Sequence, residues 1–186
     1  VSTDDEEIAS VAQSYGASVP FLRPALLADD FVGTTDVIVH AIEQLRSGGE
    51  QPSLVCCLYA TAPFVRSQDL VAGYKCWLDH GSLRPVFAAA TYPFPVQRAF
   101  LIGRDGSADM LQPEHYETRS QDLPEAYHDA GQFYWAGVQQ WLARPQFSRG
   151  CVPLILPRWR VQDVDTEEDW RQAELLHELL ELRLNE

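Results

Sequence analysis

Short apolar runs alternate with helix-periodic segments along most of this chain, and this alternation limits the possible folds more than any single motif does. Residues 54–59 (LVCCLY) form a continuous apolar run, which is typical of a strand covered on both faces. Residues 86–91 (VFAAAT) form a second such run, and residues 67–80 between them carry apolar side chains at helical spacing. Strand–helix–strand order of this kind predicts a mostly parallel sheet with helices on both faces.

The remaining periodic segments continue the pattern. They predict helices at residues 4–15, 35–46 and 166–184, and strands at residues 133–138 and 152–156. We expect Ser2 or Thr3 to cap the first of these helices and Thr35 to cap the second. No internal repeat and no linker rich in Pro, Gly or Ser divides the 186 residues, so we expect a single domain over residues 1–186.

Composition limits the partners. Hydrophobic residues make up 46% of the chain and charged residues 22%, which is typical of a globular protein. A net charge of −13 argues against nucleic acid and acidic membrane surfaces as partners, because both favour a basic face. No apolar run approaches the length of a membrane helix, so we expect no membrane association. Four cysteines without a CxxC pair predict reduced core thiols in a cytoplasmic protein.

Residues 93–130 break the alternation. They begin with a predicted hairpin, AFLIGRDGSADML, whose turn is expected at Asp105 and Gly106. A polar stretch with little periodicity follows. An excursion of this length normally serves as a binding loop, an assembly arm or both.

Asp163 and Asp165 flank one valine in VQDVDTEEDW, directly before the last predicted helix. Residues two apart in an extended backbone face the same side, so both carboxylates would point to one place. Like charges that close repel unless a cation lies between them. Paired carboxylates completed by water and substrate phosphates are the usual way in which proteins hold Mg²⁺. Asp163 and Asp165 are therefore candidate ligands of a divalent cation.

A helix start explains part of this stretch without any metal. Thr166 and Asp169 fit a capping box, and the acids between them suit the positive end of a helix. Capping accounts for residues 166–169 but leaves Asp163 unexplained. Spacing alone leaves both interpretations open.

Two further stretches offer places for a phosphate or a base. In RPALLADDFVGTTD, Arg23 is held extended before a proline, and Asp30 and Thr34 lie ahead of a helix start, where ligand oxygens bind. In YATAPF, Thr61 lies between small residues just after an apolar strand, where open α/β sheets bind their ligands. An Arg-Pro turn, a helix cap and a plain strand-ending turn are the simpler alternatives.

Residues 117–137 supply donors suited to a polyhydroxylated acid: Arg119, Gln121, Tyr127 and Gln132. Arg119 is of the residue type that forms forked pairs with a carboxylate. A solvated loop is the simpler alternative. The sequence shows no Ser-His-Asp or Cys-His arrangement and no dinucleotide-binding or Walker motif. The residues alone thus predict an acidic α/β domain with a candidate Mg²⁺ site for an anionic ligand.

The four stretches occur in the order found in the acylneuraminate cytidylyltransferase family, whose members activate nonulosonic acids. RPALLADDFVGTTDVIVHAI resembles that family's RPxELAxD segment, LYATAPF resembles the turn after its central strand, and VQDVDTEEDW resembles its (I/V)D(I/V)DT motif. STDDEEIA, YATAPF, YPFPVQRAF and YHDAGQFYW look most like the branch that acts on pseudaminic acid. The resemblance covers nearly the whole chain.

This resemblance implies a fold and a reaction. The fold would be a Rossmann-like nucleotide-diphospho-sugar transferase three-layer sandwich, with a mostly parallel sheet and an arm for dimerisation and sugar binding inserted at about residues 97–130. The reaction would condense CTP with a nine-carbon sugar acid in a homodimer that depends on Mg²⁺. The implied site residues are Asp163 and Asp165 for catalysis and metal, Arg23, Asp30, Thr34, Tyr59 and Thr61 for the nucleotide, and Arg119, Gln121, Tyr127 and Gln132 for the sugar.

The chain departs from the family pattern in two places. Tyr59 stands where sialic acid enzymes usually have Gln, so base recognition there is expected to differ. The family also opens with a strand and a basic Gly-rich loop that cradles the triphosphate, and we expect such residues upstream of Val1. The alternatives left open are sialic acid, legionaminic acid or KDO as the sugar acid, and an inactive binding module of the same fold.

Overall fold

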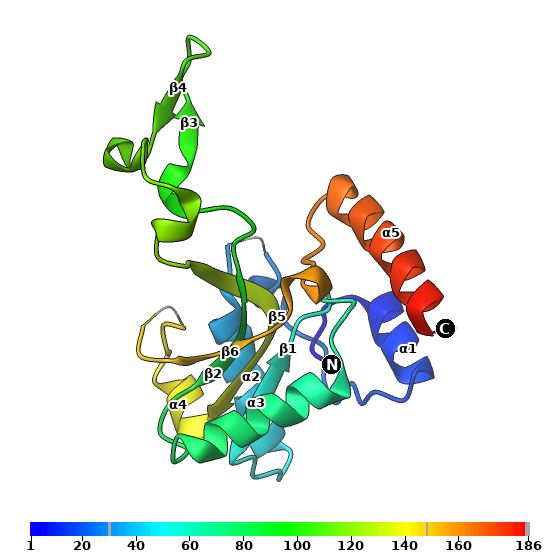
Figure 1. Ribbon diagram of the computed structural model, residues 1–186. Helices are drawn as coiled ribbons and strands as arrows, with labels where there is room; N and C mark the ends of the chain where they lie inside the picture. Colours follow the sequence, from blue (N-terminus) through cyan, green and yellow to red (C-terminus); the bar gives the residue numbers. More distant parts are fainter. Residues whose placement is uncertain (30, 148, 185–186) are drawn as a thin grey trace.

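The computed structural model describes residues 1–29, 31–147 and 149–184, and its centre is a four-stranded sheet (Figure 1). The strand order is β1-β5-β2-β6. The strands are β1 (Leu54–Leu58), β2 (Val86–Thr91), β5 (Tyr127–Gly137) and β6 (Val152–Ile155). β5 runs antiparallel to both β1 and β2, while β2 and β6 are parallel. Three of the four strands therefore run in one direction, as the mostly parallel prediction requires, with β5 between two of them.

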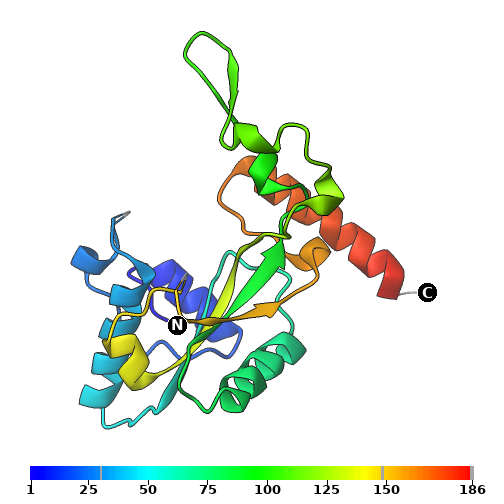
Figure 2. The same cartoon turned by 60° about the vertical axis from the view of Figure 1, so that its left-hand side comes forward.

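Helices cover both faces of this sheet. α2 (Thr34–Ser47) and α4 (Val138–Leu142) lie on one face, where Ile42 and Trp141 pack with Tyr134 and Ala136 of β5. α3 (Ser67–Asp79) lies on the other face, where Leu70 packs against Phe133. Figure 2 shows the sheet between these two layers. The expected three-layer sandwich is confirmed.

The helices form where apolar periodicity predicted them, but two of the predicted caps are wrong. The first helix, α1 (Glu6–Ser14), is capped by Asp5, whose Oδ1 accepts from the N–H groups of Glu7 and Ile8 at 2.7 and 2.9 Å. Asp5 caps the helix in place of Ser2 or Thr3 because the helix begins at Glu6, later than predicted. In α2 the capping position is Gly33, and Thr35 lies inside the first turn.

Residues 92–126 leave the sheet between β2 and β5 and project away from it in both views (Figures 1 and 2). They carry the predicted hairpin, β3 (Phe100–Ile102) paired antiparallel with β4 (Ala108–Met110). Asp105 Oδ1 accepts from the N–H and the hydroxyl of Ser107, and Gly106 takes a φ of +82°, which closes the turn as predicted.

The middle of the chain differs from the sequence prediction at β5. This strand begins at Tyr127, six residues before the predicted start, and the chain turns into α4 at Val138, a helix that the sequence did not predict. The early part of β5 lacks an alternating apolar pattern. Pairing with β2 along residues 127–129 holds it instead.

The longest helix, α5 (Glu167–Leu184), confirms the prediction for the end of the chain. Its residue Ala173 is buried, while Trp170 is 57% exposed. No helix in the described ranges is long and apolar enough to cross a bilayer.

All four cysteines are free thiols, and Cys56 and Cys57 should react with iodoacetamide only after unfolding. Burial raises the pKa of both thiols to about 12. At pH 8 a thiol with that pKa is ionised in about one molecule in ten thousand, and only the thiolate is nucleophilic. Mass spectrometry after labelling with and without denaturant measures the difference. Equal labelling of either residue under both conditions would contradict the expectation.

Candidate active site

The segment that joins β6 to α5 brings both predicted metal ligands to the end of the sheet where β1, β2 and β6 finish. A 3-10 turn, Arg158–Arg160, precedes an extended stretch, and α5 follows a capping box. Thr166 Oγ1 accepts from the N–H of Asp169 at 3.2 Å, and Asp169 Oδ2 accepts from the N–H of Thr166 at 2.9 Å. The predicted capping box is confirmed, and it does not use the side chain of Asp163 or Asp165.

Asp163 has a carboxylate oxygen that is buried and uncompensated. Its Oδ1 has no hydrogen-bond partner among the residues that the structure describes. A buried carboxylate oxygen is costly unless a donor or a cation compensates it. Asp165 is exposed two residues further on. A pair of oxygen ligands with one uncompensated atom fits a hard divalent cation such as Mg²⁺.

Within the described ranges, no group of three or more His, Cys, Asp or Glu side chains converges as a ready-made metal site. Mg²⁺ commonly takes only one or two carboxylates and completes its shell with water and substrate phosphates. The donor set of Asp163 and Asp165 matches that second arrangement.

Strand β5 lies directly against this carboxylate, which the sequence did not predict. A Cβ placed on Gly131 would come within 2.6 Å of Asp163 Oδ2, and Gly131 has a φ of +60°. Asp129 Oδ1 accepts from the N–H of Gly131 and from the hydroxyl of Tyr134, both at 2.9 Å. Burial, reinforced by the charge of Asp129, raises the pKa of Tyr134, so its hydroxyl keeps its proton. The available signal was a glycine two residues before the predicted strand at 133–138, because glycine in a strand often marks a bulge or a close approach.

Three of the predicted nucleotide residues meet at the same end of the sheet. The hydroxyls of Thr34 and Tyr59 lie 2.9 Å apart, which joins the start of α2 to the end of β1. The Tyr59 ring centroid lies 5.1 Å from that of Tyr134. The carbonyl of Thr61 accepts from the N–H of Val164 at 3.2 Å, so the turn after β1 is tied to the acidic segment.

Arg23 has different neighbours. Its guanidinium donates to Asp4 Oδ1 at 3.1 Å, and its backbone N–H donates to the carbonyl of Thr3 at 2.8 Å. These contacts hold it in the N-terminal segment rather than beside Thr34. Asp30, which was also predicted to bind the nucleotide, lies outside the described residues.

The four predicted sugar-binding residues do not form one cluster. Arg119 is exposed and forms a forked pair with Asp122 at 2.7 and 3.1 Å, Gln121 is exposed beside it, and Tyr127 donates to Glu125 at the base of the excursion. Gln132 is instead buried in β5, with 1% of its surface exposed, and its amide donates to the carbonyl of Arg160 at 3.1 Å. Gln132 therefore supports the segment that leads to the acid pair.

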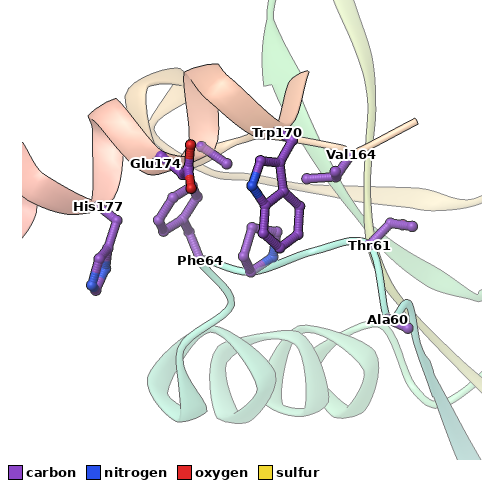
Figure 3. Close-up of a pocket in the computed structure, with 9 residues that line it drawn as sticks. Ala60, Thr61, Phe64, Val164, Trp170, Glu174 and His177 are labelled. Atoms are coloured by element: carbon purple, nitrogen blue, oxygen red, sulfur yellow. The ribbon is translucent and has the colours of Figure 1, made fainter. Parts of the chain in front are cut away.

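A pocket of about 470 Å³ lies on the other side of the acidic segment (Figure 3). The turn after β1 contributes Thr61 and Phe64, and α5 contributes Trp170 and His177. Val164 lines it too, which is consistent with the alternation of an extended backbone: the valine faces this pocket while the preceding Asp163 lies against β5.

Known proteins resemble this chain along nearly its full length, although no family model matches it. The pseudaminic acid cytidylyltransferase of Campylobacter jejuni is 41% identical over 180 residues, which cover 96% of this chain and 77% of the relative. A Helicobacter pylori protein named pseudaminic acid cytidylyltransferase and UDP-2,4-diacetamido-2,4,6-trideoxy-beta-L-altropyranose hydrolase is 32% identical over 88% of this chain and 31% of its own length. The CMP-N,N'-diacetyllegionaminic acid synthase of Legionella pneumophila is 30% identical over 96% of this chain and 77% of its own length.

A solved structure supports the fold independently. CMP:2-keto-3-deoxy-manno-octonic acid synthetase in complex with CTP superposes with a TM-score of 0.59 at 15% identity, covering 96% of this chain and 80% of its own. That likeness confirms the predicted Rossmann-like fold, and the sequence relatives add the branch. The chain belongs to the pseudaminic acid cytidylyltransferases, within the acylneuraminate cytidylyltransferase family.

Proposed function

We propose that this protein condenses CTP with a nonulosonic acid, pseudaminic acid, to give the CMP-sugar and pyrophosphate. The observation that carries the proposal is the buried, uncompensated Oδ1 of Asp163 at the carboxyl end of the sheet. Open α/β sheets bind their ligands at that end. Two of the relatives named above, from Campylobacter jejuni and Helicobacter pylori, carry the cytidylyltransferase activity in their names.

The proposed reaction forms one bond and breaks one. A hydroxyl oxygen of the sugar acid attacks the α-phosphorus of CTP, and the bond from that phosphorus to the β-bridging oxygen breaks, so pyrophosphate leaves. The proton of the attacking hydroxyl is lost to solvent. Catalysis of such a transfer consists mainly of positioning and charge stabilisation.

Asp163 and Asp165 would hold Mg²⁺. When bound, that ion supplies charge neutralisation on the phosphate oxygens. Thr34, Tyr59 and Thr61 would shape the nucleotide side, because their contacts join α2, β1 and the acidic segment. Arg23 and Asp30 are proposed for the same ligand on the family pattern alone. CTP is a cytoplasmic metabolite, so the proposed reaction places the protein in the cytoplasm.

The sugar side of the proposal rests on the projecting arm. Arg119, Gln121 and Tyr127 lie on or beside it, and Arg119 already makes the forked type of pair that would hold a carboxylate. Gln132 would act indirectly, through the hydrogen bond that its amide donates to the carbonyl of Arg160. We propose that this single domain uses its arm, at about residues 97–130, both to bind the sugar acid and to form a homodimer.

The apolar surface of the arm supports that dimer. Its exposed side chains include Phe100, Leu101, Ile102 and Tyr116, of which Ile102 is 73% exposed. Large exposed apolar side chains gathered in one segment favour an interaction site there.

Replacing Ile102 by Glu should therefore convert the dimer to a monomer. A charge in an apolar interface is left without compensation when the interface closes. Sedimentation velocity of the full-length protein measures the change, with Val71→Glu on the exposed side of α3 as the matched control. A monomeric unsubstituted protein, or an Ile102→Glu dimer of unchanged affinity, would contradict the proposed interface.

Substrate competition tests the sugar acid. Full-length protein, CTP and Mg²⁺ are mixed with pseudaminic acid, N-acetylneuraminate, a legionaminic acid or KDO, and pyrophosphate release is followed. We expect the highest kcat/KM with pseudaminic acid. A preference for another of these acids would overturn the substrate and keep the reaction, whereas no release with any of them would favour the inactive binding module.

A further inference from the structure

β5 carries a bulge at the point where it meets Asp163. Phe87 of β2 pairs with Tyr134, but Ala89, two residues on, pairs with Asp129, so residues 130–133 include extra residues on the β5 side. Gly131 lies within this bulge in the left-handed region, at φ +60°. Bulges bend a strand locally and frequently re-aim groups beside active sites.

The bulge brings the backbone of Gly131 against the carboxylate. A Cβ at Gly131 would lie 2.6 Å from Oδ2 of Asp163 and 3.0 Å from its Cγ. Real Cβ atoms essentially never approach other atoms that closely, so any side chain there would displace the carboxylate. Because Gly131 has no side chain, the Asp163 carboxylate can lie directly against the backbone of β5.

Asp129 and Tyr134 hold the bulge in shape. One oxygen of Asp129 accepts from both the N–H of Gly131 and the hydroxyl of Tyr134, each at 2.9 Å. The Tyr134 ring is itself fixed, with its centroid 5.1 Å from that of Tyr59 and 4.8 Å from that of Phe147. The Tyr134 hydroxyl thus holds the Asp129 carboxylate in place, and that carboxylate accepts from the N–H of Gly131.

We propose that Gly131, Asp129 and Tyr134 are positioning residues that set the orientation of the Asp163 carboxylate for a divalent cation. The inference rests on the proposed function, because it needs Asp163 as a metal ligand. Groups that orient a ligand in this way commonly change metal affinity by about 10- to 100-fold when they are altered.

Mn²⁺ is the probe, and EPR of the free ion gives its dissociation constant with the full-length protein. Gly131→Ala should weaken Mn²⁺ binding by about 10- to 100-fold, and Asp129→Ala and Tyr134→Phe by about tenfold. Asp129→Asn should bind Mn²⁺ within about threefold of the unsubstituted protein, because an amide oxygen accepts the same two hydrogen bonds. The Mg²⁺ activation constant should rise in parallel while KM for CTP at saturating Mg²⁺ changes little.

Two glycine controls separate positioning from damage to the fold. Gly106→Ala places a side chain at φ +82° in open space, and Gly103→Ala creates a contact of 2.9 Å with Asp105 Oδ1 in the β3–β4 hairpin, away from the acid pair. Both should leave Mn²⁺ affinity unchanged. Gly131→Ala added to Asp163→Ala should weaken binding no further, because the carboxylate that it displaces is gone.

Different results would overturn the assignment of Asp163 as a metal ligand and the positioning role of Gly131. Unchanged Mn²⁺ affinity in Asp163→Asn, or no saturable binding by the unsubstituted protein, would overturn the metal assignment itself. Weak binding in Asp163→Asn together with normal binding in Gly131→Ala would overturn only the positioning role. An additional loss in the double variant would also overturn it, since Gly131 would then act by another route.

Discussion

Replacing Asp163 by Asn should lower kcat roughly a thousandfold, the equivalent of about 4 kcal/mol of transition-state stabilisation. The amide keeps the size of the side chain but removes the negative charge that would hold the cation. Asp165→Asn should act in the same direction, because the two acids are proposed as one ligand pair. Initial rates of pyrophosphate release from CTP at several Mg²⁺ concentrations measure both the loss and any partial rescue by excess metal.

The fold should survive this change. Asp163 Oδ1 is buried without a partner in the described part of the chain, so an amide there removes an uncompensated charge. Without divalent ions, the free energy of unfolding should change by no more than about 0.5 kcal/mol. Glu168→Gln, the same chemical change in the exposed first turn of α5, is the matched control and should keep full activity. An Asp163→Asn enzyme within tenfold of the unsubstituted rate would contradict the metal assignment.

Replacing Asp69 by Ala should lower the free energy of unfolding by about 3–5 kcal/mol, because it leaves a buried guanidinium without its partner. Arg160 forks onto Asp69 with distances of 2.6 and 3.0 Å, and the two side chains are only 9% and 12% exposed. This pair ties the start of α3 to the turn that leads into the acid pair. Urea unfolding followed by circular dichroism measures the loss.

Two comparisons isolate the buried pair. Asp122→Ala removes the partner of Arg119 in the same forked geometry, but both side chains are largely exposed, so the loss should stay below about 1 kcal/mol. Asp69→Ala combined with Arg160→Met should recover most of the lost stability, since no charge then remains buried. Equal losses for Asp69→Ala and Asp122→Ala would show that burial of the pair contributes nothing.

The same pair predicts a pH dependence. Burial alone would raise the pKa of Asp69, but the hydrogen bonds and charge of Arg160 outweigh it and lower that pKa below its ordinary value of 3.8. Stability from the pair is therefore complete above about pH 4 and is lost as the pH falls through the lowered folded-state pKa. Asp69→Ala should lack this acid-induced component when unfolding is measured between pH 5 and pH 2.

Local patterns predicted the parts of the fold that local forces determine. α3 follows from apolar side chains at helical spacing, and the β3–β4 turn follows from Asp105 and Gly106. The order of strands could not be read in this way, because β5 inserts antiparallel between β1 and β2 through contacts that are distant in sequence. Residues 127–129 form a strand because they pair with β2, not because of their own pattern.

The candidate site residues also divide into those that the local sequence predicts and those that depend on contacts distant in sequence. Asp163 and Asp165 could be proposed from sequence because capping explains their neighbours but not them, and the structure keeps their side chains out of the cap. Gly131 and Asp129 were missed because their importance depends on how closely β5 approaches a residue more than thirty positions later. Gln132 was predicted as a sugar ligand from its residue type alone. Nothing in the local sequence indicated that its side chain is buried.

Transfer of the CMP group from CTP to a nonulosonic acid can be followed by ³¹P NMR. Full-length protein is incubated with CTP, Mg²⁺ and pseudaminic acid, with Asp163→Asn as the parallel sample. We expect the three CTP resonances to decline together while one phosphodiester resonance and inorganic pyrophosphate grow in equal amounts. CTP that remains intact, or that is hydrolysed to CDP or CMP without a phosphodiester, would contradict it.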